Sequence, residues 1–445
     1  MTEKFTSELA FEHALVKALQ EQYGWDDGLL DHPTPEDLVK NWQQILFENN
    51  NTVDQLNGCP LTDDEMNQVM GQIAALRTPA RLNGFINGRT VTIKRTNPED
   101  TLHMGKAVSL KIYDRREIAG GESRYQIAEQ PYFPTASPVD KDRRGDLMLL
   151  INGMPVIHIE LKRSGASCQQ AVNQIEKYSH EQVFTGICSL VQMFVAMQPE
   201  ETKYFANPGP YGEFNPKFQF HWGDVNNEPM NDWRDVAGDL LSIPMAHQMI
   251  GFYSVADGSD GVLKVMRSYQ YYAASRISDA VAKHKWGEDD IRGGYIWHTT
   301  GSGKTLTSYK AAQLISDSGK ADKVVFLLDR RELSVQSLDN YRNFVGVDAS
   351  KEEREAAVQA TEDTRTLESK LKSNDKRNTL IVSSIQKMSR IRNGAWSSQG
   401  SGCGIDTRTR RRCGCSIGRS AAPTAPSASQ CMSQSTVPTS PLGGV

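Results

Sequence analysis

Residues 143–165 have the sequence RRGDLMLLINGMPVIHIELKRSG, and this stretch decides the fold of the region around it. Two short apolar runs, LMLLI and PVIHIEL, are separated by Asn152-Gly153. An Asn-Gly pair between two apolar runs is a strong hairpin signal. We therefore expect two antiparallel strands joined by a tight turn.

Three charged residues belong to this hairpin. Glu160 and Lys162 lie two residues apart on the second strand, so their side chains share one face. A turn counted as three residues, 152–154, would pair Asp146 with Glu160, whereas a slip by one residue would put Asp146 on the other face. Two adjacent carboxylates suit Mg²⁺, which can activate a water and clamp a phosphate. Lys162 would position or deprotonate that water. The alternative is a solvated strand with ordinary charges.

Helix and strand signals are mixed over residues 1–250. The run GRTVTIKR predicts strand, SCQQAVNQIEKYSHEQ predicts helix, ICSLVQMFVAM predicts a buried strand, and residues 207–233 are expected to be irregular. The opening segment predicts an amphipathic helix, because four apolar residues recur at helical spacing: Phe11, Leu15, Ala18 and Leu19.

Strand and helix signals alternate over residues 251–395. In order they are a helix (VMRSYQYYAASRISDAVAKH), a strand (GGYIWH), a glycine-rich loop, a helix (TLTSYKAAQLISDSG), a strand (KVVFLLD), a helix and a strand (TLIVSSI). This alternation predicts a parallel sheet flanked by helices. The whole chain is therefore expected to be α/β.

The glycine-rich loop has the sequence HTTGSGKT, residues 298–305, and is followed by a helix. Its backbone N–H groups and the helix N-terminus are expected to hold phosphates. Lys304 would reach the β- and γ-phosphates of ATP, and Thr305 would bind Mg²⁺. His298 replaces the first glycine of the general pattern. The residues predicted to bind nucleotide in the loop are Thr300, Gly301, Ser302, Gly303, Lys304 and Thr305.

Composition excludes few functions. The formal net charge of −4 over 445 residues gives no global sign of nucleic-acid binding, so a DNA-binding patch would have to be local. No stretch approaches 18 apolar residues, and cysteines are sparse before residue 400, so we expect a reduced, cytoplasmic protein without membrane association. Residues 396–445 are rich in Ser, Gly, Arg, Pro and Thr and have no Lys or Glu, which predicts a disordered tail.

The hairpin and the helix after it resemble the PD-(D/E)xK nucleases, and in particular the nuclease domain of type I restriction R subunits. The resemblance implies that Asp146 and Glu160 bind metal and that Lys162 is catalytic. A Gln-x-x-x-Tyr pair on the next helix, Gln174 and Tyr178, would support the site. The chain departs from the family at Gly145, where the family has proline. Related nucleases also use a carboxylate from the first helix; here the candidate metal ligand is Glu12, and an ordinary surface glutamate is the alternative.

The second region resembles superfamily 2 helicases, and its loop has the form HTTGSGKT found in R subunits. Gln270, in the segment RSYQ, matches the glutamine that reads adenine, although a glutamine on a helix is usually only solvated. The segments FLLDRRELSVQ and IVSSIQK match two further helicase motifs, and each could also be a buried strand with a polar end. The matching residues are Asp329, Arg330, Leu333, Gln336, Ser383, Ser384 and Gln386.

The resemblance implies an R subunit of a type I restriction-modification enzyme. Such a subunit cuts foreign, unmethylated double-stranded DNA in a reaction that depends on ATP and Mg²⁺ and is coupled to DNA translocation. It would work in the prokaryotic cytoplasm with a methylation (M) subunit and a specificity (S) subunit. The alternatives are a stand-alone helicase-nuclease of DNA repair, or an inactive fragment that binds only nucleotide or partner subunits.

The resemblance divides the chain into a nuclease domain (1–250), an incomplete RecA-like motor domain (251–395) and an aberrant tail (396–445). The next motor element, an Asp-Glu-x-His box, does not occur in the sequence. We therefore expect these 445 residues not to turn over ATP. A reading-frame shift near residue 396 is a hypothesis for the change of composition, and translation of the other frames of the coding DNA tests it.

Overall fold

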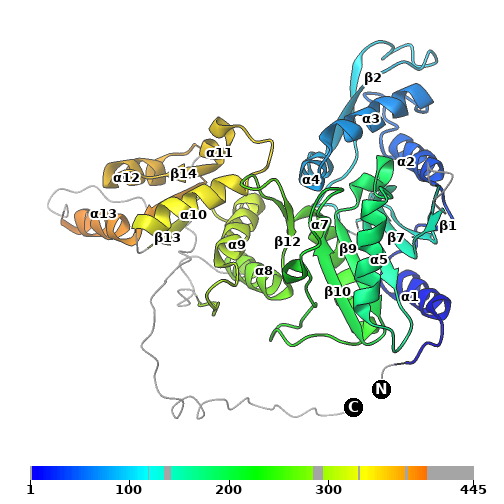
Figure 1. Ribbon diagram of the computed structural model, residues 1–445. Helices are drawn as coiled ribbons and strands as arrows, with labels where there is room; N and C mark the ends of the chain where they lie inside the picture. The colour runs from blue at the N-terminus through cyan, green and yellow to red at the C-terminus, as the bar shows by residue number, and fades with distance from the viewer. Residues whose placement is uncertain are drawn as a thin grey trace, which may run out of the picture.

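A computed structural model of the chain describes residues 3–118, 120–134, 142–283, 294–328, 331–375 and 379–397, without the side chains of 331–335 and 392–397. Helices and strands are mixed throughout these ranges, as expected of an α/β protein (Figure 1). Among the described residues, no helix combines the length and the apolar character needed to cross a bilayer.

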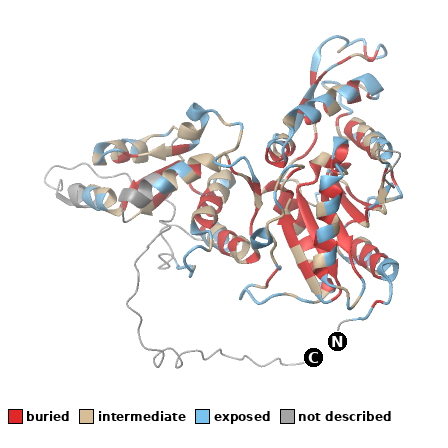
Figure 2. Cartoon of the chain, in the orientation of Figure 1, coloured by how far each residue is buried: buried red, intermediate tan, exposed pale blue. Residues whose placement is uncertain are grey.

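A six-stranded mixed sheet forms the centre of the first region. Its order is β1-β4-β7-β8-β9-β10, with β1 parallel to β4, β8 parallel to β9, and the other neighbours antiparallel. Its inner strands β7, β8 and β9 are buried along their whole length (Figure 2). The strands are β1 (Leu29–Asp31), β4 (Tyr125–Glu129), β7 (Leu147–Ile151), β8 (Met154–Leu161), β9 (Met193–Gln198) and β10 (Glu201–Ala206).

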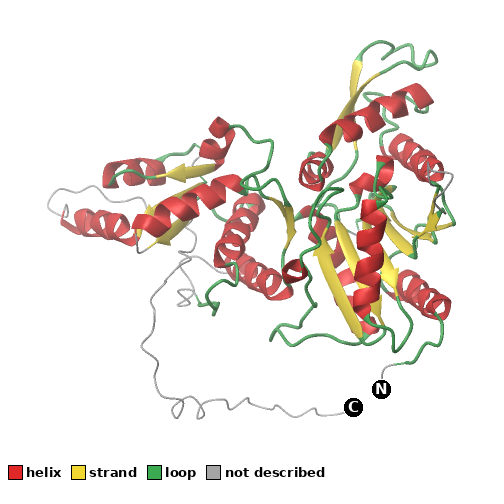
Figure 3. Ribbon diagram, in the orientation of Figure 1, coloured by secondary structure: helices red, strands yellow, loops and turns green. Residues whose placement is uncertain are grey.

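The predicted helices of this region are present. Helix α1 begins after Ser7, whose side chain accepts a hydrogen bond from the backbone N–H of Ala10, and it buries the four apolar residues expected to face the core. Helix α5 lies across β8 and β9 (Figures 1 and 3). The helices are α1 (Glu8–Gln22), α2 (Pro35–Asn49), α5 (Cys168–His180), α6 (Trp233–Val236), which continues as a π-helical turn (Ala237–Leu241), and α7 (Met245–Gly251).

The buried strand expected for ICSLVQMFVAM is shorter than predicted. Its first part, Gly186–Leu190, is a 3-10 helix, and only Met193–Gln198 is strand. Strand β9 runs parallel to β8, so the chain leaving α5 must turn before it can enter the sheet. The apolar side chains of the turn are buried too, which is why its sequence reads as a strand.

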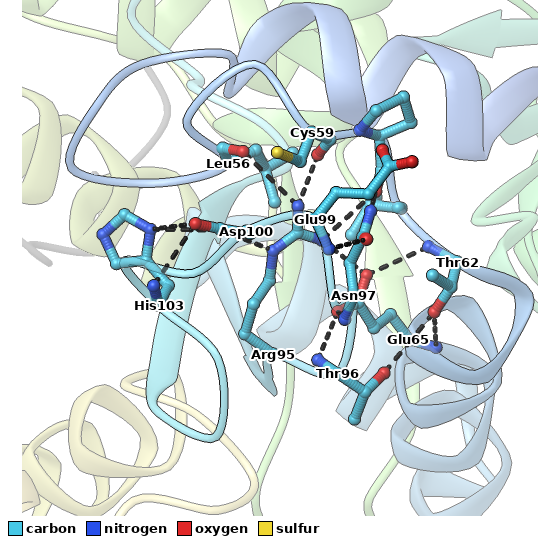
Figure 4. A network of polar contacts seen from close by, with 12 residues as sticks. Leu56, Cys59, Thr62, Glu65, Arg95, Thr96, Asn97, Glu99, Asp100 and His103 are labelled. Carbon is cyan, nitrogen blue, oxygen red and sulfur yellow. Dashed lines mark hydrogen bonds and ion pairs between the residues drawn. The ribbon is translucent and has the colours of Figure 1, made fainter.

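A small lobe lies at one end of the sheet, and one buried arginine joins the parts of this lobe to one another (Figure 4). Arg95 donates to Asp100 (Nε–Oδ2 2.8 Å) and to Glu65 (Nη1–Oε2 2.5 Å), and all three side chains are fully buried. Glu65 also accepts hydrogen bonds from the backbone N–H groups of Thr96 and Asn97. The guanidinium therefore ties a helix N-terminus to a hairpin. The elements are α3 (Asp63–Leu76), α4 (Pro79–Asn87), β2 (Thr90–Lys94) and β3 (Ala107–Lys111).

The second region contains the predicted parallel sheet, in the order β13-β15-β14, with its own hydrophobic cluster. The short strand pairs β5–β6 and β11–β12 lie outside both main sheets. The remaining elements are β5 (Tyr132–Phe133), β6 (Arg143–Arg144), β11 (Ser254–Ala256), β12 (Leu263–Val265), α8 (Ser268–Lys283), α9 (Lys304–Ser318), β13 (Val324–Leu328), α10 (Arg331–Asn343), α11 (Lys351–Ala357), β14 (Val358–Ala360), α12 (Thr364–Lys372), β15 (Leu380–Ser384) and α13 (Ile385–Ser397).

One strand of the second region was predicted wrongly. Residues 294–298, the end of the run GGYIWH, form no strand, and Tyr295 and Trp297 are 89% and 80% exposed. A strand requires a neighbour to pair with, and the three parallel strands described here pair only with one another.

The two regions meet at the end of α9. Arg115 forms an ion pair with Asp317 (Nη2–Oδ2 2.6 Å), and Arg116 donates to the backbone oxygen of Asp317 (3.1 Å). The Arg115 guanidinium also lies 5.1 Å from the ring centre of Phe252. Beside them Lys310 is buried, and burial followed by the charge of Arg115 lowers its pKa to about 7. Helix α9 thus starts at the glycine-rich loop and ends against the first region.

Candidate functional site

The β7–β8 hairpin turns at Asn152-Gly153, and both residues have positive φ, 52° and 81°. These values are typical of a two-residue hairpin turn of type I′. Ile151 pairs with Met154, so the three-residue turn predicted from the sequence was wrong. A Cβ added to Gly153 would lie 2.9 Å from the Cα of Trp42, so both the backbone and the space require glycine.

A β-bulge in the hairpin sets the register of the charged residues. The pairing shifts by one residue between the turn and the open end, where Leu147 pairs with Ile159. Extending this ladder by one residue puts Asp146 opposite Glu160 on the same face, as predicted. Without the bulge Asp146 would lie opposite Ile159 and face the other side of the sheet.

The carboxylates and the lysine gather on one face of the sheet. Lys162 Nζ lies 3.6 Å from Glu160 Oε1 and 3.7 Å from Glu8 Oε1 on α1. Asp146 Oδ2 accepts a hydrogen bond from the backbone N–H of Leu161 (2.5 Å). Glu12, one helical turn after Glu8, is buried, and its charge interacts with that of Asp146. The hairpin and the first helix therefore both contribute to this carboxylate cluster, which consists of Asp146, Glu160, Lys162, Glu8 and Glu12.

The electrostatics of the cluster follow from burial. Burial, and then the charge of Glu160, raises the pKa of Asp146 well above its usual range, and burial likewise raises the pKa of Glu160. The pKa of Glu12 rises to about 7, first through burial and then through the charge of Asp146. Neither oxygen of Glu160 has a hydrogen-bond partner among the described residues. Such carboxyls hold protons unless a cation compensates their charge.

The cluster fits a magnesium ion of the usual kind. Mg²⁺ is commonly bound by one or two carboxylates, with waters and phosphate oxygens completing its shell. Asp146 and Glu160 offer two such carboxylates, and the Glu160 oxygens have a lysine and a histidine nearby but accept no hydrogen bond from the described residues. In the part of the chain that the structure describes, no three His, Cys, Asp or Glu side chains gather at metal-ligand spacing.

The predicted Gln-x-x-x-Tyr pair connects α5 to the end of β6, just before Asp146. Gln174 Nε2 donates to the hydroxyl of Tyr178 (2.7 Å), and that hydroxyl donates to the backbone oxygen of Arg144 (2.8 Å). Arg144 lies two residues before Asp146 in the chain. The pair therefore fixes the backbone that leads into the carboxylate cluster.

Sequence reasoning missed His158, which lies on β8 two residues before Glu160 and so on the same face. Its ring is fully buried, and Nε2 lies 3.4 Å from Glu160 Oε2. Burial lowers its pKa to about 4. The period of two along the strand could have revealed it, but a histidine in an apolar run reads as core. Glu8, which is half exposed beside Lys162, was missed as well.

The glycine-rich loop has the predicted place at the start of α9, with Gly301 and Gly303 in the left-handed region (φ 76° and 77°). Lys304 Nζ donates to the backbone oxygen of Thr299 (2.7 Å) and to that of His298 (3.3 Å). Its amine is exposed and satisfies the loop's own carbonyl groups. A bound phosphate would have to take it over from them.

Gln270 lies against this loop rather than free in solvent. Its Nε2 is 3.3 Å from the backbone oxygens of Ser302 and Gly303, and its Oε1 accepts from the backbone N–H of Arg267. Tyr269 also donates to Ser302 O (2.9 Å). The segment RSYQ and the loop, 28 residues apart in sequence, thus form one unit.

Two family models match the chain. "Type I restriction enzyme R protein N terminus" matches residues 5–213, and "SWI2/SNF2 ATPase" matches residues 269–409. The type I restriction enzyme SauCOLORF180P endonuclease subunit of Staphylococcus aureus (strain COL) is 31% identical over 390 residues, 87% of this chain and 37% of that protein. The C-terminal part of a type I restriction enzyme endonuclease subunit, MpnIIP of Mycoplasma pneumoniae, is 34% identical over 174 residues, 38% of this chain and 80% of that protein.

The chain belongs to the type I restriction enzyme R proteins. It spans 37% of the length of the staphylococcal relative. The EcoprrI endonuclease subunit of Escherichia coli is 29% identical over 195 residues, 43% of this chain and 60% of that protein. The R protein match contains the carboxylate cluster, and the ATPase match contains the glycine-rich loop.

Some predicted residues of this R protein lie outside the part of the chain that the structure describes. Asp329 and Arg330 lie outside the described residues, as does the side chain of Leu333. The described remainder of those two motifs is Gln336 on α10, Ser383 and Ser384 at the buried end of β15, and Gln386 on α13. Of the tail predicted to be disordered, residues 396 and 397 are the end of α13, and residues 398–445 lie outside the description.

Proposed function

We propose that the carboxylate cluster is the DNA-cleaving site of a type I restriction R subunit. The observation that carries the proposal is the register of the β7–β8 hairpin, which sets Asp146 opposite Glu160 with Lys162 beside them. Two carboxylates and a lysine on one sheet face are the groups that metal-assisted phosphodiester hydrolysis needs. We infer that the first region is a PD-(D/E)xK nuclease domain.

Each residue has a defined task in this proposal. Asp146 and Glu160 would hold Mg²⁺, which would supply charge stabilisation and a water of lowered pKa, and Glu12 would be a further ligand only after moving closer to them. Lys162, held 3.6 Å from Glu160, would orient that water and offset the charge that develops on the phosphate. Gln174 and Tyr178 would keep the backbone that leads into Asp146 in place through the backbone oxygen of Arg144.

The second region is proposed to be the first part of a RecA-like motor that uses ATP. Thr300, Gly301, Ser302 and Gly303 would hold the phosphates with their backbone N–H groups. Lys304 would leave its carbonyl partners for the β- and γ-phosphates, and Thr305 would bind Mg²⁺. Gln270, already against the loop, would read adenine. The motor would translocate double-stranded DNA.

We propose that this machinery acts in the prokaryotic cytoplasm, in a complex with M and S subunits, on foreign unmethylated DNA. The S subunit would read the DNA site, so this chain would contribute cleavage and no sequence preference. Named relatives of the chain are endonuclease subunits of type I enzymes, which supports this assignment.

The test is cleavage of unmethylated plasmid by an R subunit carrying this sequence, assembled with its M and S subunits, ATP and Mg²⁺. Asp146→Asn should abolish cleavage because a neutral amide is a poor ligand for a divalent cation. Lys217→Ala, at an exposed lysine of the 3-10 helix Pro216–Phe218, is the control and should cut like the parent. Cleavage by Asp146→Asn at the parent rate would show that the cluster is not the active site.

A further inference from the structure

His158 is a buried polar side chain that the proposed mechanism does not yet use. It lies on β8 and is fully buried, and neither ring nitrogen has a hydrogen-bond partner among the described residues. An unpaired polar group in the interior costs free energy. One partner is close, because Nε2 lies 3.4 Å from Glu160 Oε2, and that carboxylate oxygen is itself unpaired.

The side chains packed around His158 restrict the position of its imidazole ring. Phe184, Phe194 and Tyr178 surround it edge to face, with ring centres 5.2, 6.1 and 6.4 Å away. In the link between β6 and β7, a Cβ added to Gly145 would lie only 2.8 Å from His158 Cε1. The missing side chain of Gly145 therefore makes room for the imidazole next to the carboxylates. An aromatic pocket of this kind would accept an apolar ring more cheaply than histidine.

Glu160 lies between two nitrogen donors. His158 Nε2 is nearest to Oε2, and Lys162 Nζ is nearest to Oε1, 3.6 Å away. An ionised carboxylate has about four lone-pair sites, so a hydrogen bond at each oxygen still leaves a lone pair on each for a cation. Two donors at opposite oxygens would fix the rotation of the carboxylate.

We propose that His158 is a positioning residue that donates its Nε2–H to Glu160 Oε2 and so orients the carboxylate toward the divalent cation. The inference rests on the proposed function, since it assigns His158 to the same metal site. A group that orients a metal ligand in this way contributes about 10- to 100-fold to metal affinity. With its proton on Nε2 the ring donates to Glu160, and that nitrogen has no lone pair left to bind the metal.

The experiment is titration of the 445-residue chain with Mn²⁺ alone, followed by electron paramagnetic resonance of the free ion. His158→Gln retains a donor in the place of Nε2 and should keep Mn²⁺ affinity within about threefold of the parent. His158→Asn has its amide in the place of Nδ1 and cannot reach Glu160, and His158→Phe fills the pocket with no donor. Both should weaken Mn²⁺ binding about tenfold or more.

Thermal unfolding of each variant separates loss of the donor from loss of the fold, and the Gln–Asn pair decides the question if the Phe variant does not fold. Unchanged Mn²⁺ affinity in folded His158→Asn overturns the proposal, and so does an equal loss in His158→Gln, because ring shape would then be what matters. Glu160→Gln in the same titration tests the metal site itself. If Glu160→Gln leaves binding unchanged, or the parent binds no Mn²⁺, the metal-site assignment fails; if only Glu160→Gln loses binding, the role of His158 alone fails.

Discussion

The carboxylate cluster and the glycine-rich loop differ in how far the free protein has already built them. The cluster lies on buried strands, and its register is fixed by a two-residue turn and a bulge. The loop is exposed, and Lys304 is bonded to the loop's own backbone. The side chains of the first site are held by buried strands, and a proton or a cation would balance their charge, whereas the second would have to exchange internal contacts for contacts with a ligand. Preorganisation on strands and adaptability in a loop are thus combined in one chain.

The largest expected effect tests whether the two sites do separate chemistry. Lys162→Ala in the assembled R subunit should lower DNA cleavage at least about 100-fold, because the developing charge on the phosphate loses its partner. ATP turnover should stay at the parent rate. Lys304→Ala is the matched control and should stop both, since cleavage is proposed to follow ATP-driven translocation. Loss of ATP turnover in Lys162→Ala would contradict the separation.

Burial in the first region should also make its stability depend on pH, which is not expected of the exposed loop. We expect the free energy of unfolding to change by about 3 kcal/mol through His247. His247 accepts a hydrogen bond from Tyr125 at Nδ1 and donates to the backbone oxygen of Asp114 from Nε2, both at 3.0 Å. Burial lowers its pKa to about 4, although Asp114 and Glu117 act in the opposite direction. The unfolded chain binds the proton first, so the contribution of His247 is complete above pH 6.5 and is lost as pH falls toward 4.

Urea unfolding of parent and His247→Gln between pH 7 and 4 measures this effect. The parent should lose about 3 kcal/mol more over that range than the variant, which has nothing to protonate at this position. The difference between the two is required, because carboxyls of raised pKa such as Glu12 gain stability as pH falls through the same range. Parallel curves would show that His247 is not held neutral.

A smaller effect tests whether the turn builds the cluster. Gly153→Ala should destabilise the chain by about 1–2 kcal/mol more than Gly165→Ala in urea unfolding. Both glycines have φ near +80°, but only Gly153 faces the backbone of Trp42, while nothing lies within 4 Å of a Cβ at Gly165. Equal losses would mean that the close approach to α2 does not constrain the turn.

The same hairpin shows how far sequence reasoning reaches. Asn152-Gly153 revealed the turn, and the need to bring Asp146 and Glu160 together led to the correct partner. The bulge was not predicted, because it shifts the pairing of the two strands by one residue and no residue type in the sequence marks its position. The position of Gly153 against Trp42 depends on a helix about 110 residues earlier. Local pattern therefore predicted the elements, and tertiary packing set the register.

In the second region the local pattern was less reliable. The sequence pattern gave α9, β13 and β15 correctly, because α9 packs one side on the core and the two strands are short apolar runs that are mostly buried. It gave a strand for residues 294–298, whose apolar letters are exposed. Apolar character alone does not supply the pairing partner that a strand needs. His158 is the opposite case. It is a polar residue in an apolar run, and its proposed role depends on Glu160, two residues further along the strand.

The smallest expected effect tests how firmly the two regions are joined. Asp317→Asn removes the ion pair with Arg115 at the end of α9 and leaves the backbone oxygen that Arg116 uses. The pair is partly exposed, so we expect a loss of about 1 kcal/mol or less. Amides in the last turn of α9 should then exchange with deuterium up to about fivefold faster, since 1 kcal/mol is a factor of about five in an opening equilibrium. Asp279→Asn, on an exposed i,i+4 pair of α8, is the control and should leave that turn unchanged.

Faster exchange that extends to β8 would mean that the two regions open together, because the strands of the carboxylate cluster would share the opening of α9. Faster exchange that is confined to the end of α9 would show instead that the ion pair is a local contact. The carboxylate cluster would then keep its geometry independently of the conformation of the glycine-rich loop.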